Sequence, residues 1–125
     1  MSIDNDFFGA WSRLSAIDLQ IVRFVCSQID LIRVSPELCG YLGAMCENEM
    51  EHRSDLRVTP PHPGTWRSLD NGRLSKAYTA SSGIRRASIQ SNALHEWASL
   101  LVDAVCDEMA ARLQVSQQLA DAENN

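Results

Sequence analysis

Apolar side chains recur at helical spacing at both ends of this 125-residue sequence. The N-terminal repeat runs through Phe7, Ala10, Leu14, Ile17, Ile21, Phe24, Gln28 and Leu31. The longer C-terminal repeat runs through Ile84, Ala87, Ser91, Leu94, Ala98, Leu101, Val105, Glu108, Arg112, Val115 and Leu119. A period of about 3.5 residues places such side chains on one face of an α-helix. The sequence therefore predicts an all-α fold, a small single-domain bundle with two long heptad-patterned helices.

The start points of these two long helices are less certain than their periodicity. Ser15 and Asp18 have the spacing of a capping box, so the N-terminal repeat predicts either one long helix or a kinked one. Apolar residues within 16–32 cover about half of the helix circumference, and we expect this stretch to belong to the core. At the other end, Ser91 or Asn92 is able to cap a helix that starts later than the repeat itself.

A middle helix is predicted over residues 36–53. Ser35 is a favourable N-cap and Pro36 occupies the first helical position, a combination typical of helix starts. Gly40 and Gly43 lie inside this helix and indicate either a close approach by another backbone or glycines that are simply tolerated. The buried stripe of the helix is expected to consist of Leu38, Leu42, Met45 and Cys46.

Residues 53–82 lack helical periodicity and include the breaker-rich segment 59–64, so we expect an irregular connection here. Asn71 and Gly72 form a favoured two-residue hairpin turn, which makes a short β-hairpin the alternative within this connection. That register would place Arg67 opposite Lys76, and two like charges in this position disfavour the hairpin.

Charge is segregated along the chain, with net values of −5 for residues 1–52, +5 for 53–90 and −5 for 91–125. In one interpretation the basic side chains are solvated or pair with acidic helix faces. In the other they contact phosphate groups or an acidic partner. The candidate contact residues are Arg67, Arg73, Lys76, Arg85 and Arg86.

Glu108 and Arg112 interrupt the apolar face of the C-terminal repeat. They lie four residues apart with the acid first, which allows them to bond to each other. Either they are exposed to solvent, or they face a partner helix and set its register. In the second interpretation the partner seam consists of Leu101, Val105, Glu108, Arg112, Val115 and Leu119. A homodimer is the simplest assembly that covers such a seam.

No residue pattern predicts catalysis, a cofactor or a metal site. Glu49 and His52 have the Glu-x-x-His spacing of metal-binding bundles, but such sites need the motif twice, and His95 does not repeat it. The histidines occur in no triad context, and no glycine-rich phosphate loop is present. We therefore expect a protein that is not an enzyme and binds no cofactor.

The four cysteines form no C-x-x-C pair and are interpreted as small buried hydrophobic residues. No apolar run approaches the roughly 18 residues of a membrane span, and the first residues do not resemble a signal peptide. We therefore expect a cytoplasmic protein without a membrane partner.

The function expected from these features is a non-enzymatic protein-interaction module. It would be an adaptor or inhibitor that binds another protein through helical faces, as a homodimer. One alternative is a nucleic-acid-associated regulatory protein that uses the arginine-rich segment 53–86, although Glu47 and Glu51 make the middle helix a poor DNA reader. The other alternative is a metal-dependent helical enzyme.

Overall fold

The computed structural model describes residues 3–57 and 65–124, which form α-helices and one short 3-10 helix but no strand. The predicted all-α class is therefore confirmed. The elements are α1 (Ile3–Arg13), α2 (Ala16–Cys26), α3 (Ile29–Val34), α4 (Pro36–Ser54), the 3-10 helix η1 (Thr65–Ser68), α5 (Asn71–Ala87) and α6 (Asn92–Asn124).

The N-terminal repeat is divided among α1, α2 and α3 and does not form one long helix. Its first break is the capping box: the Ser15 hydroxyl accepts from the Asp18 backbone N–H at 3.0 Å, and the Asp18 carboxylate accepts from the Ser15 N–H at 3.2 Å. Because an N-cap residue lies outside the helical conformation, the chain changes direction at this point. The Ser91 hydroxyl also donates to Asp18 at 3.1 Å, which ties the start of α2 to the start of α6.

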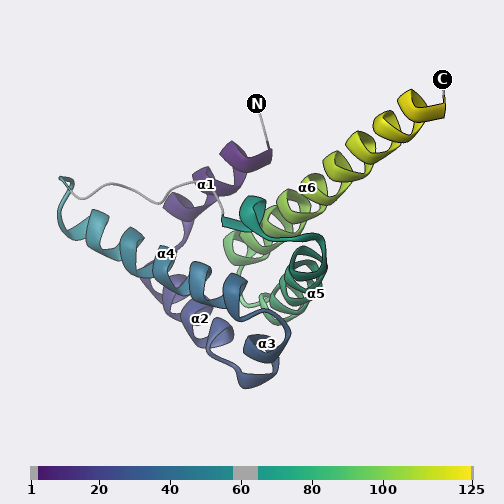
Figure 1. The fold of residues 1–125 in the computed structure, drawn as a ribbon. Coiled ribbons are helices and arrows are strands. Elements are labelled where there is room, and N and C mark those ends of the chain that lie inside the picture. Colours follow the sequence, from purple (N-terminus) through teal and green to yellow (C-terminus); the bar gives the residue numbers. More distant parts are fainter. Residues whose placement is uncertain (1–2, 58–64, 125) are drawn as a thin grey trace.

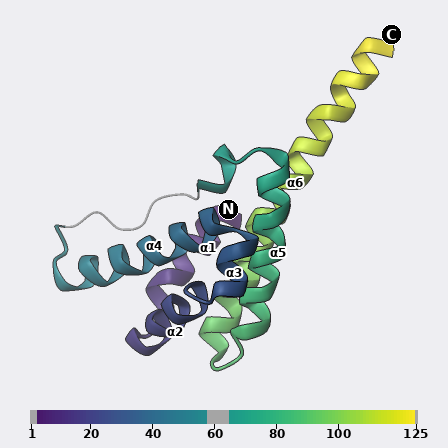
Figure 2. The ribbon, with the colours of Figure 1, turned by 60° about the horizontal axis from the view of Figure 1, so that its bottom comes forward.

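The helices form two packed groups that share α5 and α4 as neighbours (Figure 1). In the first group, α1 and α5 both pack against α6. In the second group, α2 packs against α4, and the short α3 lies between α4 and α5. Figures 1 and 2 both show that the C-terminal half of α6 extends beyond every other helix.

An aromatic cluster forms the centre of the first group. The Phe7 ring lies 5.9 Å from Trp11, 5.6 Å from Trp66 and 5.9 Å from Trp97 between ring centroids. All four side chains are almost completely buried, so α1, η1 and α6 share one apolar core. The three indole N–H groups have no acceptor among the described residues, so their desolvation offsets part of this stabilisation.

Arg53 links the end of α4 to the turn between α1 and α2. Its guanidinium donates to the backbone carbonyls of Trp11 at 3.0 Å and Leu14 at 2.7 Å, and its Nε donates to the buried Glu49 at 2.9 Å. The last carbonyls of a helix have no partner inside the helix, so a cation placed there satisfies them. This contact holds α4 across the end of α1.

The expected irregular connection is wrong for residues 71–82, and the β-hairpin is wrong as well, because α5 occupies this stretch. Asn71 and Gly72 form the first turn of α5 rather than a hairpin turn. The Asp70 carboxylate caps the helix by accepting from the Arg73 N–H at 2.8 Å. Its buried side chains, which a strand reading cannot pair, follow helical spacing: Leu74, Ala77, Ala80, Ser81 and Ile84. The breaker-rich segment 59–64 lies outside the described residues.

The predicted middle helix is confirmed as α4, with its expected stripe buried. The Ser35 hydroxyl caps it by accepting from the Leu38 N–H at 3.3 Å. No heavy atom lies within 4 Å of a Cβ built at Gly40 or Gly43, so no other backbone approaches them and both are tolerated glycines. At the start of α6, the Ser91 hydroxyl accepts from the Leu94 N–H at 3.1 Å, as expected of a cap.

Candidate functional site

The projecting end of α6 exposes apolar side chains to solvent. Burial along α6 ends near Val105, and every described side chain from Leu113 onward is exposed. The large apolar ones are Leu113, Val115 and Leu119, which are 66, 55 and 62% exposed. We refer to residues 113–124 as the α6 tail. At about 1.5 Å per residue the tail extends roughly 18 Å beyond the last buried turns.

The predicted partner seam is split into parts with different surroundings. Leu101 and Val105 are buried in the chain's own core. Glu108 and Arg112 are half-buried, and Val115 and Leu119 lie on the α6 tail. Only the last two seam residues therefore have large exposed apolar side chains.

Arg112 makes contacts within its own chain. Its Nε donates to Glu108 at 3.0 Å, Nη1 donates to the Asn71 side chain at 3.0 Å, and Nη2 donates to the Arg67 carbonyl at 3.0 Å. The guanidinium thus fastens α6 to η1 and to the start of α5. Beyond this point α6 has no further neighbour among the described residues.

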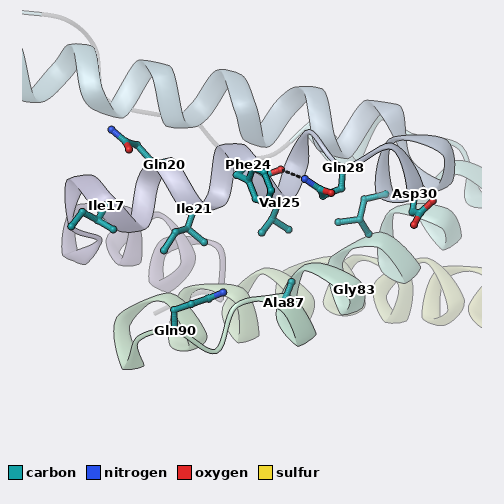
Figure 3. Close-up of a pocket in the computed structure, with 11 residues that line it drawn as sticks. Ile17, Gln20, Ile21, Phe24, Val25, Gln28, Asp30, Gly83, Ala87 and Gln90 are labelled. Carbon is teal, nitrogen blue, oxygen red and sulfur yellow. Dashed lines mark hydrogen bonds between the residues drawn. The ribbon is translucent and has the colours of Figure 1, made fainter.

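A second uncovered surface is a groove between α2 and α5, which we call the α2–α5 groove (Figure 3). Its volume is about 640 Å³. Figure 3 shows Ile21 and Val25 pointing from α2 toward α5, with Ala87 and Gln90 on the opposite wall. The groove is lined by Ile17, Gln20, Ile21, Phe24, Val25, Gln28, Asp30, Leu31, Gly83, Ala87 and Gln90.

The groove consists largely of residues that the repeat assigned to the core. Ile17 and Phe24 are 72 and 67% exposed, so the prediction that 16–32 is core is wrong for one side of α2. Val22 on the other side is buried, as expected of a helix that packs on α4. Apolar residues cover more of α2 than one neighbouring helix can bury, and the excess lines the groove.

The groove is almost uncharged. Asp30 is its single charged lining residue, and the Gln28 amide donates to the Phe24 carbonyl at 3.1 Å. A Cβ built on Gly83 would lie 2.9 Å from Leu31 Cδ2, so glycine at this position allows α3 to approach α5. The same Cβ would lie 3.8 Å from Arg86 Nη2, which places a guanidinium at the α5 wall.

The structure does not bring the five predicted phosphate-contact residues into one cluster. Arg73 lies 3.7 Å from both Glu37 and Asp70, and Lys76 is exposed one turn farther along α5. Arg85 and Arg86 lie in the last turn of α5, about 18 Å along the helix axis from Arg73. The fifth residue, Arg67, lies in η1.

The Glu-x-x-His pair is not part of a ligand cluster in the described chain. Glu49 is 5% exposed and is bonded to Arg53. Within residues 3–57 and 65–124, no group of three or more His, Cys, Asp or Glu side chains lies close enough to hold a metal ion.

Three of the four thiols are buried, which confirms their interpretation as core residues, whereas Cys106 is exposed and contradicts it. Cys106 lies on α6 away from the buried face of that helix. Burial raises the pKa of the Cys26 thiol strongly, and the nearby Cys39 and Cys46 add to this rise. Burial likewise raises the pKa of Cys46 to about 12. Protonated thiols are poor nucleophiles, so these side chains act as packing groups.

The sequence analysis missed two components of these surfaces. Leu113 lies off the heptad positions, and no sequence signal marks it as exposed. The groove-forming side of α2 does have a signal, since its apolar residues extend over too wide an arc for one partner.

The chain matches no protein-family model, and comparison with curated proteins and with solved structures gives no significant match. None of the described helices combines the length and the apolar composition that crossing a membrane requires.

Proposed function

We propose that this protein is a non-enzymatic protein-interaction module, an adaptor or inhibitor, and that it works as a homodimer through the α6 tail. The proposal rests on one observation: α6 continues beyond the bundle while exposing Leu113, Val115 and Leu119.

The physical argument is the instability of a solvated apolar helix. A helix of about three turns is marginal in water unless packing stabilises it. Full burial of a leucine or valine side chain contributes about 1.5–3 kcal/mol. A partner that covers the α6 tail therefore stabilises both the helix and its exposed side chains.

Nucleic-acid binding has less support. Arg73 lies beside two carboxylates, and the remaining basic side chains of α5 lie at opposite ends of the helix. A phosphate backbone is bound best by cations gathered on one face. The protein-interaction proposal needs no such cluster.

Light scattering coupled to size-exclusion chromatography tests the homodimer. A contact of about −7 kcal/mol is half formed near about 10 µM, so the mass is measured above and below this concentration. We expect dimers that dissociate on dilution. The double variant Leu113→Ser with Leu119→Ser is expected to be monomeric.

The matched control is Gln114→Ser with Gln117→Ser, which alters the opposite face of the same tail. This control is expected to dimerise like the parent chain. A parent chain that stays monomeric throughout, or a control that dissociates as readily as the leucine variant, would contradict the proposal.

A further inference from the structure

Two uncovered apolar surfaces belong to the same chain, one a projecting helix and the other a groove. We propose that the α6 tail of one copy docks in the α2–α5 groove of a second copy, and that the exchange is reciprocal. This inference rests on the proposed homodimer and identifies the surface that receives the tail.

Tail-to-tail pairing leaves too little surface for a stable dimer. Stable interfaces bury about 800 Å² on each partner, and one face of a three-turn helix supplies only part of this area. Along the predicted seam, Arg112 is already bonded to η1 and α5, so Val115 and Leu119 remain. Docking in the groove adds a second apolar wall, and a reciprocal exchange forms the contact twice.

The two surfaces also match in length. From Ile17 to Val25 the α2 wall is about 12 Å long, and from Leu113 to Leu119 the tail spans about 9 Å. Both run along helix axes, and an amphipathic helix laid in an apolar groove is a common recognition mode. The exposed tail side chains therefore fall within the length of the groove.

Charge is matched as well. Residues 113–120 include no charged side chain, which suits a groove whose lining has Asp30 as its single charge. Acidic residues follow directly, beginning at Asp121. Arg85 and Arg86 stand at the α5 end of the groove and form no ion pair within the described residues. The acidic end of the tail thus meets a basic end of the groove.

Disulfide trapping between two differently tagged chains tests this contact. In a Cys106→Ser background, one chain has Gln90→Cys in the groove and the other has Ser116→Cys on the tail. Docking holds the two thiols at an effective concentration near the millimolar range, so the mixed disulfide is expected to form about 100-fold faster than by random collision. The buried thiols of the core serve as the unreactive background.

The outcomes separate this inference from the proposed function. Faster homodisulfide formation by the tail variant would mean that tails pair with tails, which overturns the groove contact but keeps the dimer. Homodisulfides of the groove variant, or assemblies that grow beyond two copies, would also overturn the reciprocal exchange. A monomer without rapid trapping overturns both proposals and leaves the groove to a helix of another protein.

A groove substitution gives an independent measurement. Phe24→Ser removes a large groove side chain that is already exposed, so the fold is expected to persist. We expect the dimer dissociation constant to rise at least about tenfold. Leu56→Ser is the matched control, because Leu56 is 81% exposed and lies outside the groove. Equal dissociation constants for the two variants would contradict tail docking.

Discussion

The N-terminal and C-terminal repeats are each buried over their first turns and uncovered over their last ones, but the uncovered parts have different shapes. The N-terminal repeat breaks at the Ser15 capping box, and its second part lies along α5 as one wall of a groove. The C-terminal repeat has no such break, so α6 continues straight past the last helix that could cover it. A single polar motif thus separates a concave apolar surface from a projecting one.

This difference shows what helical periodicity means physically. The spacing identifies which side chains share a face, and that face is buried only where another element lies against it. Phe7 and Phe24 belong to the same repeat, yet the first is completely buried and the second is 67% exposed.

The largest expected effect separates the two halves of α6. Trp97→Ala opens a cavity in the aromatic cluster and is expected to lower the free energy of unfolding by about 3–5 kcal/mol. Leu119→Ala on the tail is expected to change it by less than about 0.5 kcal/mol at concentrations where the chain is monomeric. Chemical denaturation measures both. Similar losses for the two variants would mean that the tail is buried within the monomer.

The next effect concerns the break in the N-terminal repeat. Arg53→Gln removes the cation that satisfies the Trp11 and Leu14 carbonyls and leaves the buried Glu49 without its partner. We expect a loss of about 2 kcal/mol in the free energy of unfolding. Arg57→Gln is the control, because this exposed arginine bonds only to its neighbour Asp55 among the described residues, and we expect no change. Equal stability of the two variants would show that the α1–α2 turn holds without Arg53.

A smaller effect of opposite sign distinguishes an open helix face from the groove wall. Gly40→Ala adds a methyl group in open space and is expected to stabilise α4 by up to about 1 kcal/mol. Gly83→Ala gains the same helix propensity but displaces Leu31, so we expect less stabilisation. Thermal unfolding of both variants measures the difference. A greater gain at Gly83 would mean that α3 is free to move away from α5.

The smallest effect is chemical rather than energetic. Cys106 is exposed, whereas Cys26, Cys39 and Cys46 are buried and their pKa values are raised by that burial. In the folded protein an alkylating reagent is therefore expected to label Cys106 first and the other thiols only after unfolding. Mass spectrometry after timed labelling measures the order. Early labelling of Cys46 would show that α2 separates readily from α4.

Local chemistry made part of the fold predictable. The Ser15 capping box, the Ser35 cap followed by Pro36, and the cap at Ser91 are short-range signals, and the structure contains all three. Residues 71–82 were misassigned because Asn71 and Gly72 favour a hairpin turn. The Asp70 cap, together with burial of Leu74 and Ala77, outweighed that preference.

The candidate surfaces were only partly predictable. The sequence places Val115, Leu119 and Phe24 on apolar helix faces, but it does not tell which face meets another helix. The groove depends on α3 approaching α5 at Gly83, a contact between residues about 50 positions apart whose formation depends on packing.

By itself, the sequence determined that the chain is helical, where its capped helices begin and which side chains share each face, because these properties depend on neighbours within a few residues. Only the tertiary structure decided which faces are covered, since burial requires that distant segments meet and exclude water. For this protein that decision buried the aromatic cluster and left the α2–α5 groove and the α6 tail uncovered.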